Sequence, residues 1–160
     1  MLKSRLFIAC FCLFLASWPR ETRANSFIAD AAPTHSEVCL ATAMYHEARG
    51  EGWLGMVAVG YVVLNRAAIS ESEPCSIITA RNGHHCQFTF TCRRAVIHRD
   101  DESWHVAVLL SRQIMSIGGI DDPTSGATFF AQCQLPSNDW NGRVMRIGGH
   151  CFWRSEPEGR

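Results

Sequence analysis

One segment of this chain, residues 53–67, constrains the fold more than any other. Its apolar side chains leave no polar stripe around a helical wheel: Met56, Val57, Val59, Tyr61, Val62, Val63 and Leu64. A surface helix would carry such a stripe, so the pattern predicts a helix buried at the centre of a domain. Gly55 and Gly60 lower its helix propensity but allow neighbouring helices to approach closely.

Capping residues mark further helices on either side of this segment. Thr34 and Glu37 have capping-box spacing, which predicts a helix that runs to about Ala48 and stops at Gly50. A short helix is expected over residues 74–80. A long one is expected over residues 102–117, because Asp101 can cap its start and Gly118-Gly119 can end it.

The C-terminal third contains strand-like segments. Residues 127–133 form one, and residues 144–153 are typical of a hairpin around Gly148-Gly149. Residues 87–91 alternate with period two, which predicts a further short strand. Helices followed by strands indicate a small α+β domain, in which a helical half with a central buried helix meets a short antiparallel sheet.

The N-terminus has the features of an export signal. Lys3 and Arg5 precede an apolar run of 13 residues, 6–18, and Ala24 offers a small residue for cleavage. The run is too short to cross roughly 30 Å of hydrocarbon as a helix. We therefore expect a signal peptide over residues 1–24, a tether over 25–33, one domain over 34–155 and a tail over 156–160. No stable membrane span is expected after cleavage.

Charge and cysteine content agree with export. Beyond residue 24 the chain has 11 arginines and 14 acidic residues without a basic patch, so nucleic acid is not an expected partner. The same part holds six cysteines, an even set that predicts up to three disulfides in an oxidising compartment, periplasmic or extracellular. Cys133 and Cys151 are the favoured pair because they flank the predicted strand–turn–strand unit.

The stretch from Tyr45 to Glu51 carries the strongest catalytic candidate. It places Glu47 on the last turn of the first predicted helix, where apolar neighbours and the negative end of the helix dipole both raise a carboxyl pKa. A protonated carboxylic acid there is suited to protonating a glycosidic oxygen. Glu51 is a possible second carboxylate, although the helix is expected to end between the two. The alternative is that Glu47 is an ordinary solvated glutamate.

Other chemistries fit less well. His84, His85, Cys86 and Cys92 resemble a zinc set, but their spacing matches no standard finger or ribbon, so we expect no metal and no cofactor. Most aromatic side chains of the strand-rich half are expected in the core. Trp140, in a polar stretch, is the best candidate for stacking on a sugar ring.

Together these segments resemble the SleB-type cell-wall hydrolase family over roughly residues 37–154. The matching stretches are Cys39-Leu40-Ala41, residues 45–51, residues 57–66, residues 86–90 with Cys92, Gly126-Ala127-Thr128, and residues 147–153. The resemblance implies a lysozyme-like fold. It also implies cleavage of peptidoglycan glycan strands between N-acetylmuramic acid and N-acetylglucosamine, by lytic transglycosylation or muramidase hydrolysis.

The same resemblance implies roles for individual residues. Glu47 matches the family's catalytic glutamate, the general acid. In a lytic transglycosylase the muramyl 6-hydroxyl is the nucleophile, which would explain why no second carboxylate stands out. Gln87, Thr128 and His150 are expected to contact substrate by motif position. The alternative for His150 is a hairpin histidine satisfied by backbone groups, and Asn65 is expected to bond backbone rather than sugar.

Two departures from the family pattern leave other functions open. Many relatives have histidine and tyrosine where this chain has Phe129 and Phe130, and Asp-Gly where it has Arg93-Arg94. A cell-wall-binding accessory protein without turnover is therefore one alternative. A Cys/His peptidoglycan endopeptidase is another, although it needs a free cysteine and the six leave no odd one. The sequence does not indicate an oligomeric state.

Overall fold

The computed structural model describes residues 31–133 and 144–154. The chain divides into two compact units, Met1–Ala32 and Pro33–Arg160, and every described helix and strand belongs to the second. The predicted signal peptide, residues 25–30 of the predicted tether, Trp140 and the tail over 156–160 lie outside the described residues.

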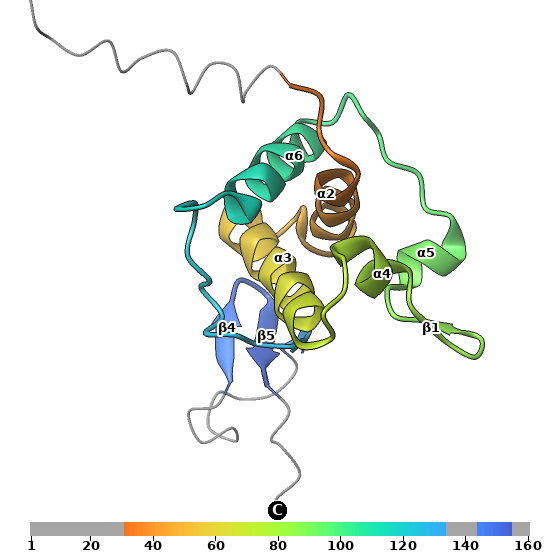
Figure 1. Cartoon of the computed structure of the whole chain (residues 1–160), viewed down its shortest axis with the longest axis vertical. Helices are drawn as coiled ribbons and strands as arrows, with labels where there is room; N and C mark the ends of the chain where they lie inside the picture. Colours follow the sequence, from red (N-terminus) through yellow and green to blue (C-terminus); the bar gives the residue numbers. More distant parts are fainter. Residues whose placement is uncertain (1–30, 134–143, 155–160) are drawn as a thin grey trace, which may run out of the picture. The chain divides into compact units, whose positions relative to one another are not determined.

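Three helices pack against one another around the core (Figure 1): α2 (His35–Ala48), α3 (Gly52–Ile69) and α6 (Glu102–Met115). The prediction of a central helix is confirmed, because nine α3 residues between Gly55 and Ala67 are buried. Within the described chain, α3 is long and apolar enough to cross a membrane by length and composition. Half of that stretch is buried inside the protein, as in a core helix.

Gly60 lies where α3 meets both neighbouring helices. A Cβ atom at this position would stand 2.6 Å from Ile114 Cδ1 on α6 and 3.2 Å from Met44 Sδ on α2. Real Cβ atoms do not approach carbon so closely, so the missing side chain is what lets the three helices pack at this distance. The packing role expected for Gly60 is therefore confirmed.

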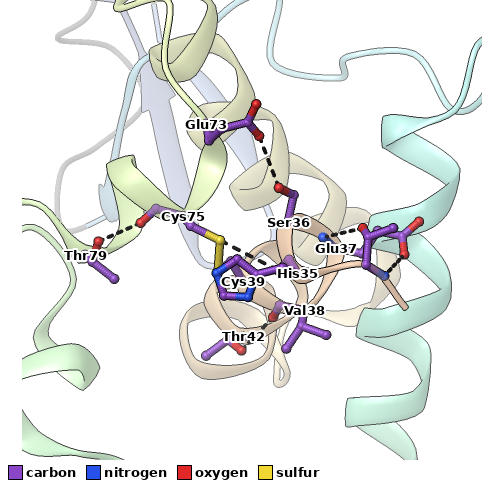
Figure 2. Close-up of a disulfide and its surroundings, with 10 residues drawn as sticks. His35, Ser36, Glu37, Val38, Cys39, Thr42, Glu73, Cys75 and Thr79 are labelled. Carbon is purple, nitrogen blue, oxygen red and sulfur yellow. Dashed lines mark hydrogen bonds between the residues drawn. A yellow bond between two sulfur atoms is a disulfide. The ribbon is translucent and has the colours of Figure 1, made fainter. Parts of the chain in front are cut away.

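The predicted caps hold the helix ends. Glu37 N–H donates to Thr34 Oγ1 at 3.3 Å and Thr34 N–H donates to the Glu37 carboxylate at 2.6 Å, which completes the capping box. Asp101 Oδ1 accepts from Ser103 N–H at 2.9 Å. The short helix α4 (Pro74–Thr79) is joined to α2 by the Cys39–Cys75 disulfide, and the Glu73 carboxylate accepts from the Ser36 hydroxyl beside it (Figure 2).

A three-stranded antiparallel sheet lies next to α3 (Figure 1), in the order β3 (Phe129–Gln132), β5 (His150–Trp153), β4 (Met145–Ile147). Phe129 pairs with Trp153 and Gln132 with His150. The hairpin around Gly148-Gly149 is confirmed, and Gly148 has the positive φ of 59° that favours glycine in such a turn. Cys133 and Cys151 are bonded, as the sequence favoured.

The strand predicted over residues 87–91 is wrong. These residues follow a two-stranded ribbon, β1 (Arg81–Asn82) and β2 (His85–Cys86), and then enter a short helix, α5 (Thr89–Arg93). The Cys86–Cys92 disulfide explains the difference, because its Cα atoms are 5.9 Å apart. An extended chain would separate residues six positions apart by roughly 20 Å. The period-two pattern came from Phe88 and Phe90. Both are buried, one just before the start of α5 and one within it.

Candidate active site

A pocket of about 510 Å³ lies between the end of α2, the residues before α5 and the sheet. It contains Glu47, Glu51, Gln87 and His150, which the sequence had singled out as site residues, and Phe130, which it had singled out as a departure from the family pattern. It also contains residues to which the sequence gave no role: His46, Arg66, Phe88, Thr89, Ala131 and Gln132. Its mixture of carboxyl, imidazole, amide and aromatic groups suits a polar ligand with apolar faces, such as a sugar.

Glu47 occupies the last turn of α2, as predicted, and is half-buried at the pocket. Desolvation by burial raises the pKa of its carboxyl above the ordinary value, in the direction expected from the sequence. Burial penalises the charged carboxylate and favours the neutral acid. The position therefore favours a carboxyl group that can donate a proton to a bound ligand.

Glu51 lies between α2 and α3 and binds the β4–β5 hairpin. Its Oε2 accepts a hydrogen bond of 2.5 Å from Gly149 N–H, and its Oε1 stands 3.9 Å from His150 Nδ1. A Cβ atom at residue 149 would lie 2.9 Å from Glu51 Oε1, so the glycine allows the carboxylate to approach the turn. Glu47 and Glu51 line the same pocket, but the Glu51 carboxylate is hydrogen-bonded to the hairpin.

Two histidines present unpaired nitrogens in this region. His150 is 93% buried, and its Nδ1 has no hydrogen-bond partner among the described residues. The alternative that backbone groups satisfy this imidazole therefore fails for Nδ1. His46 stacks on Phe90 with ring centroids 4.7 Å apart, and its buried Nε2 likewise has no partner within the described chain. Burial, and then the charge of Arg49, lower the pKa of His46, which favours its neutral form.

Other predicted residues have different places. Thr128 is buried and does not line the pocket; its N–H donates to Trp153 O at 3.0 Å. Asn65 Nδ2 donates to Ala127 O at 3.0 Å, a backbone contact as expected, and also to Asp122 Oδ2 at 3.0 Å. Asp122 accepts further bonds from Thr124 and Gly126, so this carboxylate holds a turn together.

Phe130 and Arg66 are two pocket residues that the sequence comparison with the family had already touched on, without a substrate contact being predicted for either. Phe130 forms part of the pocket lining, stacked on Phe152 at 6.0 Å and edge-on to His150 at 5.6 Å. It is one of the two phenylalanines that depart from the family pattern; the other, Phe129, is 40% exposed and does not line the pocket. Arg66 ends the Leu-Asn-Arg stretch that carried part of the resemblance.

The cysteines of the domain are all in disulfides: Cys39–Cys75, Cys86–Cys92 and Cys133–Cys151. Cys86 and Cys92 are thus unavailable to the zinc set considered above. Within the described residues, one histidine–cysteine group has metal-like spacing, namely His35, Cys39 and Cys75. Figure 2 shows that its two sulfurs are bonded to each other, and metals bind thiolates. This group is therefore a disulfide with a neighbouring imidazole.

Comparisons with known proteins agree with this geometry. The sequence profile of the cell wall hydrolase family matches residues 50–153. The chain belongs to this family. It is 32% identical over 116 residues to a spore cortex-lytic enzyme of Halalkalibacterium halodurans, an alignment that covers 71% of this chain and 33% of the relative. The chain thus spans about a third of the length of that curated relative.

The fold is also that of a solved catalytic domain. The crystal structure of the catalytic domain of the Bacillus cereus SleB protein superimposes with a TM-score of 0.51 and 26% identity, covering 77% of this chain and 93% of that one. The α+β architecture is therefore lysozyme-like, as the resemblance implied. The family match begins at Gly50, so Glu47 lies just before the matched range.

Proposed function

We propose that this cell wall hydrolase family member is an exported enzyme that cleaves peptidoglycan glycan strands, with Glu47 as the general acid. The observation that carries the proposal is the half-buried Glu47 carboxyl, whose pKa is raised by desolvation at the end of α2 in a pocket lined by polar and aromatic groups. Peptidoglycan lies outside the cytoplasm, which agrees with the expected signal peptide and with three disulfides.

The proposed reaction begins with proton transfer. Glu47 donates its proton to the glycosidic oxygen between N-acetylmuramic acid and N-acetylglucosamine as the bond from that oxygen to the muramyl C1 breaks. The leaving sugar departs with a new hydroxyl group. The muramyl 6-hydroxyl oxygen then bonds to C1, and its proton passes to the Glu47 carboxylate. The acid is thereby regenerated, and the product is a 1,6-anhydro sugar.

The position of Glu51 supports this transglycosylase route over a muramidase that uses two carboxylates. A glycosidase with a second carboxylate needs that group free to act as a nucleophile or to activate water. Glu51 is the other carboxylate among the described residues of the pocket, and it accepts from Gly149 N–H. A single residue that acts as acid and then as base meets the demand of transglycosylation.

Product analysis tests the proposal. The full-length chain is expressed with its leader, and the exported protein is incubated with purified sacculi; soluble products are separated by mass spectrometry. We expect anhydro-muropeptides, whereas reducing ends would show hydrolysis by water. Binding to sacculi without any soluble product would favour the accessory role that the Phe130 substitution keeps open.

Replacing the acid provides the decisive control. Glu47→Gln keeps the size of the side chain but removes the transferable proton, so we expect the cleavage rate to fall by about 10²–10⁴-fold. Glu71→Gln changes an exposed glutamate outside the pocket and should leave the rate unchanged. Undiminished cleavage by Glu47→Gln would refute the assignment.

A further inference from the structure

Arg66 is a half-buried cation at the pocket without a carboxylate partner among the described residues. Its Nε donates to Thr128 O at 2.6 Å, and its guanidinium carbon stands 5.5 Å from the centroid of the Phe129 ring. These contacts fix the plane of the guanidinium group. They leave its two terminal nitrogens without an acceptor in the described part of the chain.

An unpaired cation in this position has an electrostatic cost. Burial alone lowers the pKa of Arg66, so its charge is held where solvent offsets it less than on an open surface. Arginine nevertheless stays protonated, and its planar fork of N–H groups matches a carboxylate in a bidentate pair. An anionic group on a ligand would restore the missing counter-charge.

Arg66 lies near the C-terminal end of α3, far along the helix from Glu47 and Glu51. Arg66 comes 15 residues after Glu51, about 22 Å along a helix axis. Helical side chains lean toward the N-terminus of their helix, so the guanidinium reaches back toward the glutamates. Glu51 and Arg66 line the same pocket, so it extends along α3.

We propose that Arg66 forms a carboxylate-binding subsite of this pocket, which selects glycan strands that carry carboxylates over neutral ones. The proposal rests on the proposed function, because it assigns the ligand to the substrate strand. The carboxylate has two sources on such a strand: the peptide stem attached to muramic acid, or the lactyl group of a muramic acid whose stem has been removed. A subsite cation also offsets the repulsion between an anionic strand and the pocket's own carboxylates.

Binding measurements test the subsite without cleavage. Glu47→Gln protein is titrated calorimetrically with stem-bearing and stem-free glycan strands, each unmodified and with its carboxylates converted to amides. We expect amidation to weaken binding by at least about tenfold, the loss typical of a hydrogen bond to a charged group. A loss of affinity on amidating the stem-free strand identifies the lactyl carboxylate as a ligand, whereas a loss on amidating the stem-bearing strand alone identifies the stem.

Arginine variants connect this preference to one residue. Arg66→Gln should weaken binding of the carboxylate-bearing strands as much as amidation does, and should not weaken binding of the amidated strand further. Arg154→Gln is the matched control: Arg154 Nε also donates to a backbone carbonyl, Gly126 O at 2.6 Å, but the residue is exposed and does not line the pocket.

Two results would overturn the subsite. One is equal affinity of the Glu47→Gln protein for the amidated and unmodified forms of both the stem-bearing and the stem-free strand, a comparison that does not require the Arg66 variant to fold. The other is an equal loss on both strands in Arg66→Gln, which would make Arg66 a support for Thr128 alone. Cleavage without carboxylate preference would refute the subsite and leave the proposed function standing. A carboxylate preference without cleavage would support the subsite and refute the proposed glycan cleavage.

Discussion

At the scale of single residues, the pocket gives two neighbouring glutamates different surroundings. Glu47 stands on the last turn of α2 with a pKa raised by burial, and Glu51 begins the next helix with its carboxylate against the hairpin turn. Four positions in sequence separate them, but the chain turns between α2 and α3. The environment, and not the residue type, therefore decides which carboxyl is suited to proton donation.

The raised pKa of Glu47 has a consequence for stability. The unfolded chain ionises Glu47 at its ordinary pKa, and the folded chain ionises it at a higher one. The contribution of the neutral Glu47 to the free energy of unfolding is complete below the pKa that Glu47 has in the unfolded chain. It is lost as pH rises through the pKa that Glu47 has in the folded chain. We therefore expect Glu47→Gln to raise the free energy of unfolding at neutral pH, and to raise it less at pH 4. Urea titrations of both proteins at the two pH values measure this, and a gain that grows on acidification would contradict it.

Substitutions at Glu51 separate a positioning role from a catalytic one. Glu51→Gln retains an oxygen that can accept from Gly149 N–H, whereas Glu51→Ala does not. If the carboxylate only holds the hairpin, the glutamine variant should keep cleavage within about tenfold of the native rate and the alanine variant should lose clearly more. Steady-state rates and thermal melts of both variants decide the matter. Equal and severe losses, with both proteins folded, would make Glu51 a catalytic carboxylate.

At the scale of elements, local signals in the sequence were sufficient for the three long helices, α2, α3 and α6. Thr34 and Asp101 cap the helices they were expected to cap, and the uniformly apolar segment is the buried α3. Each of these features depends on residues within a few positions of one another. The strand expected at residues 87–91 failed because a disulfide closes that segment, and nothing in the sequence indicated that Cys86 pairs with Cys92.

The same distinction holds for the pocket. Glu47, Gln87 and His150 belong to short motifs, and all three line it. Thr128 belongs to a motif too, but its place depends on how β3 pairs with β5 and on the contact with Arg66, and it is buried outside the pocket. Arg66 was part of a matching stretch without an assigned role, because only the packing of α3 beside the sheet brings it to the pocket.

Helix packing at Gly60 provides an element-level prediction. Gly60→Ala introduces a methyl group against Ile114 Cδ1, and such overpacking costs about 1–3 kcal/mol. Better helix propensity returns up to about 1 kcal/mol. We expect a net loss of stability in denaturant titrations. Combining it with Ile114→Val, which removes that Cδ1 atom, should recover part of the loss. Strictly additive effects in this cycle would show that the two residues do not compete for space.

At the scale of the whole domain, the helices carry the acid and the sheet carries His150 and Phe130. Disulfides join pieces that contribute to both halves. One ties α2 to α4, a second closes the segment that enters α5, and a third links the end of β3 to β5. The pocket lies among these joined segments, so its geometry depends on covalent closure as well as on the core.

Removing single disulfides should therefore destabilise the domain in a defined order. Cys39–Cys75 closes a separation of 36 residues and Cys86–Cys92 a separation of six. In the chain-entropy description, these closures stabilise the fold by about 4 and about 2 kcal/mol. We expect Cys39→Ser with Cys75→Ser to lower the free energy of unfolding more than Cys86→Ser with Cys92→Ser, in urea titrations without reductant.

Activity should follow the opposite order, because the short loop lies nearer the pocket. Gln87, Phe88 and Thr89 line the pocket and all fall inside the loop that Cys86 and Cys92 close. The serine pair at 86 and 92 should therefore weaken cleavage of sacculi at a temperature where both variants are fully folded. The loop that Cys39 and Cys75 close also contains pocket residues, Glu47 and Arg66 among them, but these stand on α2 and α3, which pack in the core. The cleavage rate of this pair should therefore stay near the native one. Equal rates for the two folded variants would mean that packing alone, without the disulfide, holds this side of the pocket.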